Sequence, residues 1–508
     1  MSGPERADPA AGDTAPPLHR FDVDRRDLLK LLGGGMLFCL ARAPEAGAQE
    51  SGRAVGGEKP KELSAWLHID KDGKITAFTG KVEVGQNIRT SLAQQVAEEL
   101  GVAVASVAMV MGDTDRTPFD MGTFGSRTTR EMAPFLRAVA ASAREGLIDA
   151  AAKLWSVDRA GLSIKNGRVV SPSGKSASFG ELTRGEELVA TVDERSALTP
   201  ATTWRIAGQT VPKIQGRDFV TGAHRYSSDL TRPGMLHGKI LRPPSFRARI
   251  AGADGTKAAA MPGVEVVIDG DFIGVAAPDP GTARRAVDAI TVKWTEKPDQ
   301  PSDATIFEYL KSNARPPEAG AAAADPAVAQ ALATAPIRLK QTYTVAYIAH
   351  APLEPRAAVA EWERGKLTVW TGTQRPFAVR DQLAETFRIP RESVRVIVPD
   401  TGSAYGGKHQ GDAAVEAARL AKSADKPVKV VWSREEEFTW AYFRPAGVIE
   451  VATGATGDGA ITAWDFHNYN SGPAAIETPY EVAHKTVRYH PVESPLRQGS
   501  YRALAATA

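Results

Sequence analysis

The sequence VRVIVPDTGSAYGGKHQGD, residues 394–412, joins a predicted strand to a predicted helix through a glycine-rich turn. Residues 396–398 predict a buried strand, which ends at Pro399, and the helical pattern covers 413–424. Four glycines lie between the two elements, namely Gly402, Gly406, Gly407 and Gly411. Glycines here let backbone N–H groups approach an anionic ligand closely, near the positive N-terminus of the helix. The stretch therefore predicts an anion-binding turn and leaves open which anion it binds.

Gly402 to His409 also fits most of the phosphate-binding pattern G-x-x-x-x-G-K-[ST]. That pattern requires Ser or Thr after the lysine to hold Mg²⁺, and here His409 follows Lys408. A P-loop nucleotide binder is therefore a distant alternative. A turn that only lets a strand and a helix pack is a second alternative for this loop taken alone.

Two loops nearer the N-terminus repeat the same arrangement. A hairpin predicted over 66–79 leads into the loop 80–86, and an amphipathic helix follows as far as Leu100. A strand over 107–111 then precedes MGTFGSRTT, residues 121–129, which opens a second long helix. Three such loops in one chain predict one large, multiply charged ligand held by several helix N-termini.

The N-terminus predicts an export signal. Arg25 and Arg26 stand immediately before the apolar run 28–41, which is too short to span a bilayer, and 46–48 has the A-x-A cleavage pattern. We expect twin-arginine export of the folded protein to the periplasm, with residues 1–48 removed. A retained membrane anchor or a buried helix is the alternative interpretation of the apolar run.

Composition restricts the class of protein and its cofactors. The 508 residues, 43% hydrophobic and 24% charged, are typical of a soluble globular protein of two or three domains. A net charge of +2 does not favour nucleic acid as a partner. Cys39 is the only cysteine and lies inside the predicted signal, so we expect no disulfide, iron–sulfur cluster or C-x-x-C-H haem site in the mature chain. Redox chemistry would need a non-cysteine cofactor and a partner that carries electrons.

Sequence pattern divides the chain after the signal into five parts. They are an N-terminal segment with two of the loops (62–150), a connection (151–205), a unit of alternating strands and helices (211–297), a linker rich in Ala, Pro and Asp (298–335), and a segment around the glycine-rich turn (336–508).

Several motifs resemble the molybdenum-binding large subunit of the xanthine dehydrogenase and aldehyde oxidase family. Six occur in the family's order: VPKIQGRDFVTGAHRYSSDL, GMLHGKILRPP, AHAPLEPRAAVAEW, VWTGTQRPFAVRDQLAETFRIP, GSAYGGKHQGDAAVEAA and GSYRALAAT. TGKVEVGQ and MGTFGSRTT resemble two pterin-binding segments that usually stand near the end of that subunit. Their early position resembles the family branch that contains the β-subunits of isoquinoline 1-oxidoreductase. The resemblance covers most of residues 62–508. It implies an α+β fold with a circularly permuted molybdopterin-binding domain and an α/β hammerhead-like domain over 211–297.

The implied activity is hydroxylation of an N-heteroaromatic compound or an aldehyde, with water as the oxygen source. The implied cofactor is molybdopterin, in its cytosine dinucleotide form, whose dithiolene rather than a side chain holds molybdenum. Electrons would pass to a small [2Fe–2S] subunit, and a c-type cytochrome would be the next carrier. A non-catalytic subunit of the same fold is the main alternative.

The resemblance also implies roles for nine residues. Gln374 would hydrogen-bond an oxygen ligand of molybdenum, and Tyr405 and Gly406 would lie beside the metal, with the Gly406 N–H facing its apical oxygen. His409 stands where purine-oxidising relatives often carry glutamate, so we do not expect a purine substrate, and its imidazole could orient a heteroaromatic ring or its carboxylate. The pterin and its phosphates would be held by Gly85, Gln86, Gly125, Ser126 and Arg502.

The family pattern continues beyond the last residue for roughly one further domain. That region of a relative carries a G-V-G-E segment whose glutamate acts as the general base, and no such segment occurs in this sequence. We therefore expect a fragment, one half of a split subunit or an inactive chain, and expect residues 49–508 alone to be inactive. Glu354 and His409 are the first alternative bases to test. His350 and Glu354 would otherwise line a substrate funnel or fix a loop by hydrogen bonds.

Overall fold

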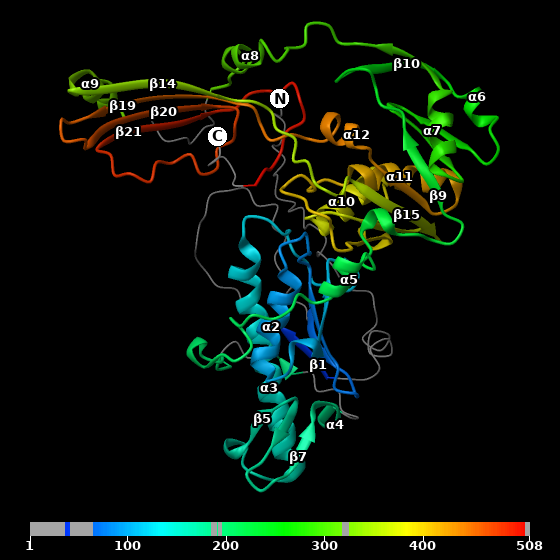
Figure 1. Ribbon diagram of the computed structural model, residues 1–508, viewed down its shortest axis with the longest axis vertical. Coiled ribbons are helices and arrows are strands. Elements are labelled where there is room, and N and C mark those ends of the chain that lie inside the picture. The colour runs from blue at the N-terminus through cyan, green and yellow to red at the C-terminus, as the bar shows by residue number, and fades with distance from the viewer. Residues whose placement is uncertain (1–35, 41–63, 184–189, 192–195, 317–324, 503–508) are drawn as a thin grey trace, which may run out of the picture.

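The computed structural model describes residues 36–40, 64–183, 190–191, 196–316 and 325–502. They form an N-terminal body, blue to cyan in Figure 1, and a larger C-terminal body, with helix α5 (Gly216–Thr221) between them. Arg25, Arg26 and the predicted cleavage site at 46–48 lie outside the described residues.

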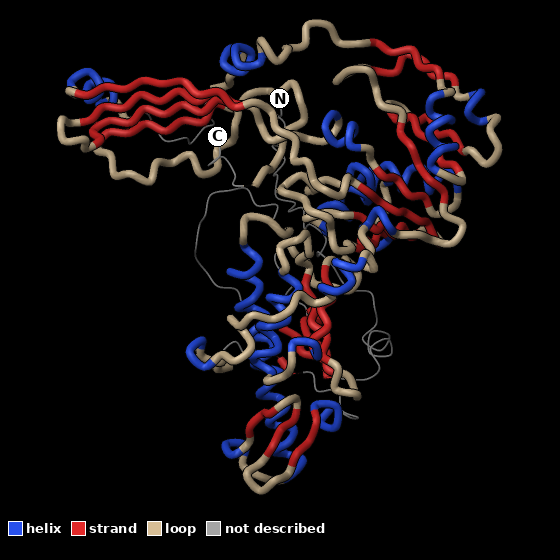
Figure 2. The backbone as a smooth tube through the Cα atoms, viewed as in Figure 1, coloured by secondary structure: helices blue, strands red, loops and turns tan. Residues whose placement is uncertain are grey.

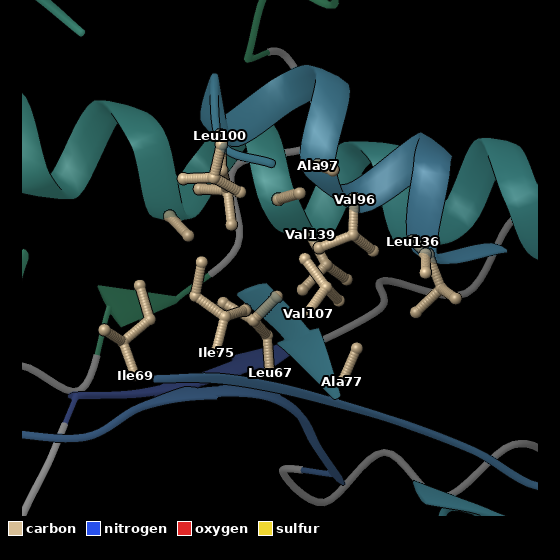
Figure 3. Packing of buried hydrophobic residues seen from close by; sticks show 14 of the residues in the cluster. Leu67, Ile69, Ile75, Ala77, Val96, Ala97, Leu100, Val107, Leu136 and Val139 are labelled. Atoms are coloured by element: carbon tan, nitrogen blue, oxygen red, sulfur yellow. The ribbon is translucent and has the colours of Figure 1, made fainter. Parts of the chain in front are cut away.

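A five-stranded sheet forms the centre of the N-terminal body, in the order β4-β3-β2-β1-β8. Its strands are β1 (Met36–Leu40), β2 (Ser64–Ile69), β3 (Ile75–Thr79), β4 (Val107–Met111) and β8 (Ala190–Thr191). Helices α2 (Ile88–Leu100) and α3 (Ala133–Trp155) pack on it, because alternate strand residues such as Leu67 and Ile75 face helix residues such as Val96 and Leu136 (Figure 3). The predicted hairpin, helix and strand are confirmed.

Strand β1 lies inside the apolar run that the sequence analysis assigned to an export signal. It pairs antiparallel with β2 and parallel with β8. Removal of residues 1–48 would remove β1 and leave β2 as an edge strand. A molecule cleaved after Ala48 therefore cannot have this order of strands. Cleavage after Ala48 stays a prediction.

The connection 151–205 contains a small sheet of its own. Strands β5 (Ser163–Lys165), β6 (Arg168–Val170) and β7 (Ser176–Ser178) precede helix α4 (Phe179–Thr183). Asn166 and Gly167 have φ values of 49° and 71°, as a tight hairpin turn between β5 and β6 requires.

A seven-stranded sheet forms the centre of the C-terminal body, in the order β11-β12-β9-β18-β15-β16-β17. Its strands are β9 (Leu236–Ile240), β11 (Glu265–Asp269), β12 (Phe272–Ala277), β15 (Ala357–Glu363), β16 (Lys366–Thr371), β17 (Val394–Ile397) and β18 (Val428–Val431). The sheet crosses the predicted boundary between 211–297 and 336–508, because β9 pairs in parallel with β18. This long-range pairing leaves no local pattern in the sequence.

Helices α10 (Pro376–Phe387) and α11 (Asp412–Ala424) cover this sheet, and α12 (Arg434–Thr439) follows β18. Helix α11 buries a stripe of alanines and lies so close that a Cβ atom at Gly238 would meet Leu420 at 2.6 Å. Beside the sheet, β10 (Arg249–Asp254) pairs with β13 (Thr291–Thr295), next to α6 (Thr256–Ala259) and α7 (Pro280–Asp288).

A separate four-stranded sheet projects from the C-terminal body, at the upper left of Figure 2. Its order is β14 (Ile337–Val345), β19 (Gly447–Ala455), β20 (Ile461–Tyr469) and β21 (His484–His490). The predicted linker 298–335 is not merely a linker, since it forms α8 (Ile306–Ser312) and α9 (Ala327–Thr334), which pack against this sheet. Among the described helices, none is long and apolar enough to cross a membrane.

The two bodies meet along β17. The Val398 N–H donates to the Gly112 carbonyl at 3.0 Å, and the Thr114 N–H donates to the Val396 carbonyl at 3.0 Å. Arg395 forms an ion pair with Asp113 at 2.6 Å. This junction fixes the N-terminal loops against the end of β17, where the glycine-rich turn begins.

Candidate functional site

One cavity of about 930 Å³ lies where the three predicted loops meet. All nine residues with predicted roles line it: Gly85, Gln86, Gly125, Ser126, Gln374, Tyr405, Gly406, His409 and Arg502. They come from both bodies of the protein and are separated by up to about four hundred positions in the chain. The structure therefore brings the nine residues together, while the role of each stays a prediction.

The first loop is held by Glu83, which the sequence analysis missed. Its buried carboxylate accepts hydrogen bonds from the backbone N–H groups of Gly85, Asn87 and Arg89 at 3.0, 3.0 and 3.1 Å. Of these donors, Asn87 is the N-cap of α2 and Arg89 lies in its first turn, where backbone N–H groups are otherwise available to a ligand. The start of α2 is thus partly capped by the protein's own carboxylate.

The side chain of Gln86 closes the same loop. Its Oε1 accepts from the Val84 N–H at 2.7 Å, and its Nε2 donates to the Val82 carbonyl at 3.0 Å. Gly85 has a φ of 101°, a conformation that glycine adopts at little cost. The loop is therefore shaped by its own hydrogen bonds before any ligand binds.

Gln374 connects the second loop to the glycine-rich turn. Its Nε2 donates to the Thr123 carbonyl at 2.8 Å, and its Oε1 accepts from the Gly406 N–H at 3.0 Å. The N–H predicted to face an oxygen of the metal is therefore bound to Gln374 in this structure. One amide hydrogen and one lone pair of Gln374 remain for a ligand.

The glycine-rich turn is strained at two residues that are not glycine. Ser403 and Tyr405 have φ values of 76° and 57°, which cost free energy for residues with a side chain. Gly406 has a φ of 90°, and a Cβ atom there would lie 3.0 Å from the Ser500 carbonyl oxygen. Strain of this kind clusters at functional sites.

Tyr442, which no motif indicated, holds the turn by two hydrogen bonds. Its hydroxyl donates to the Gly406 carbonyl at 2.5 Å and accepts from the His409 N–H at 3.0 Å. Burial raises the pKa of Tyr442 to about 12, so it remains a proton donor at neutral pH.

His409 presents an uncharged imidazole at the cavity. Burial, together with the nearby charges of Arg375 and His350, lowers the pKa of His409 to about 4. Its Nε2 is buried and has no hydrogen-bond partner among the described residues. The ring centroids of His409 and Phe124 lie 5.3 Å apart. A neutral ring of this kind can donate or accept one hydrogen bond to a ligand.

Lys408 points away from the cavity, which excludes the P-loop alternative. Its side chain is 1% exposed, and its ammonium lies 3.4 Å from the Glu354 carboxylate. Burial lowers the pKa of Lys408. A P-loop lysine must reach the phosphates of a nucleotide, and this one cannot.

His350 and Glu354 fix loops by hydrogen bonds. Glu354 accepts from the backbone N–H groups of Gly402 at 2.9 Å and Ser228 at 3.1 Å. The Nε2 of His350 lies 2.6 Å from the Ser500 carbonyl oxygen. Of the two alternative bases, His409 lines the cavity and Glu354 does not.

Two family models match the chain, over residues 34–227 and 313–490, and both describe a molybdopterin cofactor-binding domain. The chain is 32% identical over 461 residues to one of the nicotinate dehydrogenase subunits of Pseudomonas putida, covering 88% of this chain and 38% of that protein. It is 26% identical over 434 residues to the beta subunit of isoquinoline 1-oxidoreductase from Brevundimonas diminuta, covering 75% of this chain and 56% of that protein. The chain thus spans well under two thirds of either relative.

A solved structure resembles the described fold. Quinoline 2-oxidoreductase from Pseudomonas putida 86 superposes with a TM-score of 0.51 at 25% sequence identity, over 59% of this chain and 46% of that chain.

Proposed function

Because the chain belongs to the molybdenum-binding large subunits of the xanthine dehydrogenase family, we propose that it hydroxylates an N-heteroaromatic compound or an aldehyde with water as the oxygen source. The observation that supports this proposal most directly is the single cavity into which all three predicted loops open. The relatives named for nicotinate and isoquinoline favour the heteroaromatic class, since both compounds are nitrogen heterocycles.

The cavity fits a molybdopterin cofactor by its shape and its donors. Gly85, Gly125 and Gly406 line it without side chains, so a ligand can approach the backbone closely. A buried His409 nitrogen lacks a partner within the described parts of the chain. The volume of about 930 Å³ lies near the upper end of ligand sites, roughly 300–1,000 Å³, and leaves room for a large cofactor, which we propose is the cytosine dinucleotide form.

The bound molybdenum centre would supply a two-electron oxidation of the substrate carbon. The chain's own residues would bind and orient. Gln374, held by the Gly406 N–H and the Thr123 carbonyl, would offer its remaining amide hydrogen and lone pair in a fixed position, and Tyr442 keeps the turn in place. His409, held neutral, would hydrogen-bond a ring nitrogen or carboxylate of the substrate without presenting a charge.

We further propose that electrons leave through a separate [2Fe–2S] subunit, with a c-type cytochrome as the next acceptor. Both curated relatives are named as subunits, which supports a multi-subunit enzyme. Co-purification of a small cysteine-rich chain would test the first part. Full activity of this polypeptide as the only protein present would contradict it.

Purification of the native complex tests the activity itself. We expect about one molybdenum per chain by metal analysis, fluorescence of oxidised pterin after acid release, and dye-linked oxidation of an N-heterocycle. A matched variant, Gln374→Met, should keep molybdenum while losing most turnover, since it removes polar groups beside the reacting centre. A complex without molybdenum and without oxidation would disprove the proposal.

We also propose twin-arginine export to the periplasm, supported by Arg25 and Arg26. Replacement of both by Lys should leave the protein in the cytoplasm, which cell fractionation measures. Unchanged periplasmic yield would contradict export by this route. N-terminal sequencing of the wild-type protein would decide between cleavage after Ala48 and retention of β1.

A further inference from the structure

Residues 205–230, here called the strap, run between the two bodies and include α5 (Figure 1). The strap begins on the N-terminal body. There the Glu98 carboxylate accepts from the backbone N–H groups of residues 205–207 at 3.0, 2.6 and 2.9 Å. A little further on, the Ile214 N–H donates to the Thr90 hydroxyl at 3.0 Å. Hydrogen bonds to a charged group are among the stronger ones, so this end is firmly placed.

The strap ends on the C-terminal body. The Ser228 N–H donates to the Glu354 carboxylate at 3.1 Å. The Lys429 ammonium donates to the carbonyl oxygens of Ser228 and Leu230 at 3.1 and 2.9 Å. Since both ends are fixed, the residues between them are held across the cavity.

A stack of side chains holds one cation of the strap at the cavity. The Lys213 ammonium lies 4.4 Å from the Phe219 ring centroid. The rings of Phe219 and His224 are stacked, with their centroids 3.9 Å apart and an angle of 21° between their planes. His224 in turn lies 3.6 Å from the Asp400 carboxylate. Lys213 and Phe219 both line the cavity. A ring beneath an ammonium stabilises it without a carboxylate, so the contact with Phe219 leaves the Lys213 ammonium able to bind an anion.

Two cations, Lys213 and Arg502, and two carboxylates, Glu83 and Asp400, line the cavity, and the two kinds of group differ in their partners. Within the described parts of the chain, no carboxylate lies within ion-pair distance of Lys213 or Arg502, and Arg502 lies 5.4 Å from the centroid of the Tyr405 ring. The acidic residues that line the cavity already have partners. Glu83 accepts three backbone N–H groups and Asp400 pairs with Arg89. The two cations are therefore available to an oxyanion.

Lys213 is also placed beside the first loop. The next residue, Ile214, is bound to Thr90, whose hydroxyl donates to the Asn87 side chain at 2.7 Å. Asn87 directly follows Gly85 and Gln86, the residues predicted to hold the pterin and its phosphates.

We propose that Lys213 is a phosphate-binding residue of the cofactor site, and that Phe219 positions its ammonium. The proposal rests on the proposed function and adds to it a residue from the strap, which lines the same cavity as the predicted Arg502. A lysine suits this task because it binds phosphate as a compact point charge. A cofactor phosphate and a substrate carboxylate are both oxyanions, and an ammonium binds either. The location of Lys213 beside the first loop favours the cofactor phosphate.

The test compares Lys213→Met with Lys213→Arg and with Arg217→Met, an exposed cation of the same strap that does not line the cavity. Each variant is purified as the complex from cells that make the cofactor. Molybdenum and acid-released phosphate are then measured per chain. We expect Lys213→Met to retain about five- to tenfold less of both than wild type, because a charge-assisted contact is lost. Lys213→Arg should retain most, and Arg217→Met should match wild type.

A second measurement isolates binding from cofactor loading. The full chain from cells unable to make molybdopterin is titrated with inorganic pyrophosphate at low salt by calorimetry. We expect about five- to tenfold weaker binding for Lys213→Met and about two- to threefold for Phe219→Leu, which keeps the ammonium and removes the ring. Unchanged thermal unfolding of both variants confirms that they fold.

Several outcomes would overturn the proposal. They are equal molybdenum and phosphate in Lys213→Met and wild type, an equal loss in Arg217→Met, and no pyrophosphate binding by the wild-type chain. A full cofactor content in Lys213→Met, with a raised KM for pyridine-3-carboxylate and an unchanged KM for quinoline, would assign Lys213 to a substrate carboxylate instead. Failure of the proposed function is distinct, since wild type itself would then hold no molybdenum.

Discussion

The seven-stranded and four-stranded sheets of the C-terminal body differ in how completely they are covered. The first buries Val359, Leu367 and Val396 fully, and α10 and α11 lie against it. The second has α9 on one face, where Arg338 donates to the Ala333 carbonyl at 3.4 Å. On its opposite face, Leu339 and Tyr343 are 65% and 55% exposed.

This difference separates a buried support from an apolar surface that is exposed in the described chain. The cavity opens beside the buried strands β15, β16 and β17 of the seven-stranded sheet, so its geometry depends on a rigid support. The uncovered apolar face has the properties of a surface that another polypeptide covers. We expect substitutions near the first sheet to change stability, and substitutions on the uncovered face to change solubility.

The largest expected effect comes from Arg356, just before β15. Its guanidinium is buried, pairs with Glu437 and donates to the Gly407 carbonyl. Arg356→Met would leave the Glu437 carboxylate buried without its partner, at a cost of about 3–5 kcal/mol in the free energy of unfolding. Denaturant unfolding measures the change. A loss below about 1 kcal/mol would show that the turn does not depend on this ion pair.

A pair of leucine substitutions compares the two sheets directly. Leu383 on α10 is fully buried, whereas Leu339 on β14 is 65% exposed. Leu383→Ala should lower the free energy of unfolding by about 2–5 kcal/mol. Leu339→Ala should change it by less than about 0.5 kcal/mol and raise the solubility of the isolated chain. Equal destabilisation by both would mean that the exposed face is packed in solution.

The pKa of His409 makes stability depend on pH at the cavity. Because burial lowers this pKa from 6.5 to about 4, the unfolded chain binds the proton more readily than the folded chain below pH 6.5. Stability is therefore full above that pH and falls as the pH drops towards 4, by about 2 kcal/mol between pH 7 and pH 5. Denaturant unfolding at both pH values should show a smaller loss in His409→Gln. An identical loss would assign the pH dependence to other groups.

The smallest effect is expected on the four-stranded sheet. Lys311 on α8 forms an ion pair with Glu450 at 2.8 Å, and its side chain is 46% exposed. Lys311→Met should lower the free energy of unfolding by no more than about 1 kcal/mol, and less at high salt. It serves as the matched control for Arg356→Met. A loss as large as that of Arg356→Met would remove the distinction between the two sheets.

Local patterns were sufficient for most elements around the cavity. The hairpin over 66–79 and the helix ending at Leu100 follow from alternation and helical periodicity, and the strand predicted over 396–398 is found at Val394–Ile397. Motif order grouped nine residues that line one cavity, and all of them except Arg502 lie in loops between a strand and a helix. These positions converge when the sheets form.

The supporting residues could not be found in this way. Glu83 and Tyr442 act through backbone atoms of other residues, and such contacts leave no spacing in the sequence. The joining of residues 211–297 to the later sheet depends on β9 pairing with a strand far along the chain. An acidic residue a few positions before a helix was the one available signal for Glu83.

That pairing has a consequence for synthesis of the protein on the ribosome. Leu236 of β9 has Val428 of β18 as its register partner, which is translated roughly 190 positions later. At about 5–20 residues per second, β9 and the strands paired with it wait on the order of ten to forty seconds for their neighbour. During that interval the nascent chain displays an open strand edge, which is where a chaperone would bind and where a pause in translation would do most harm.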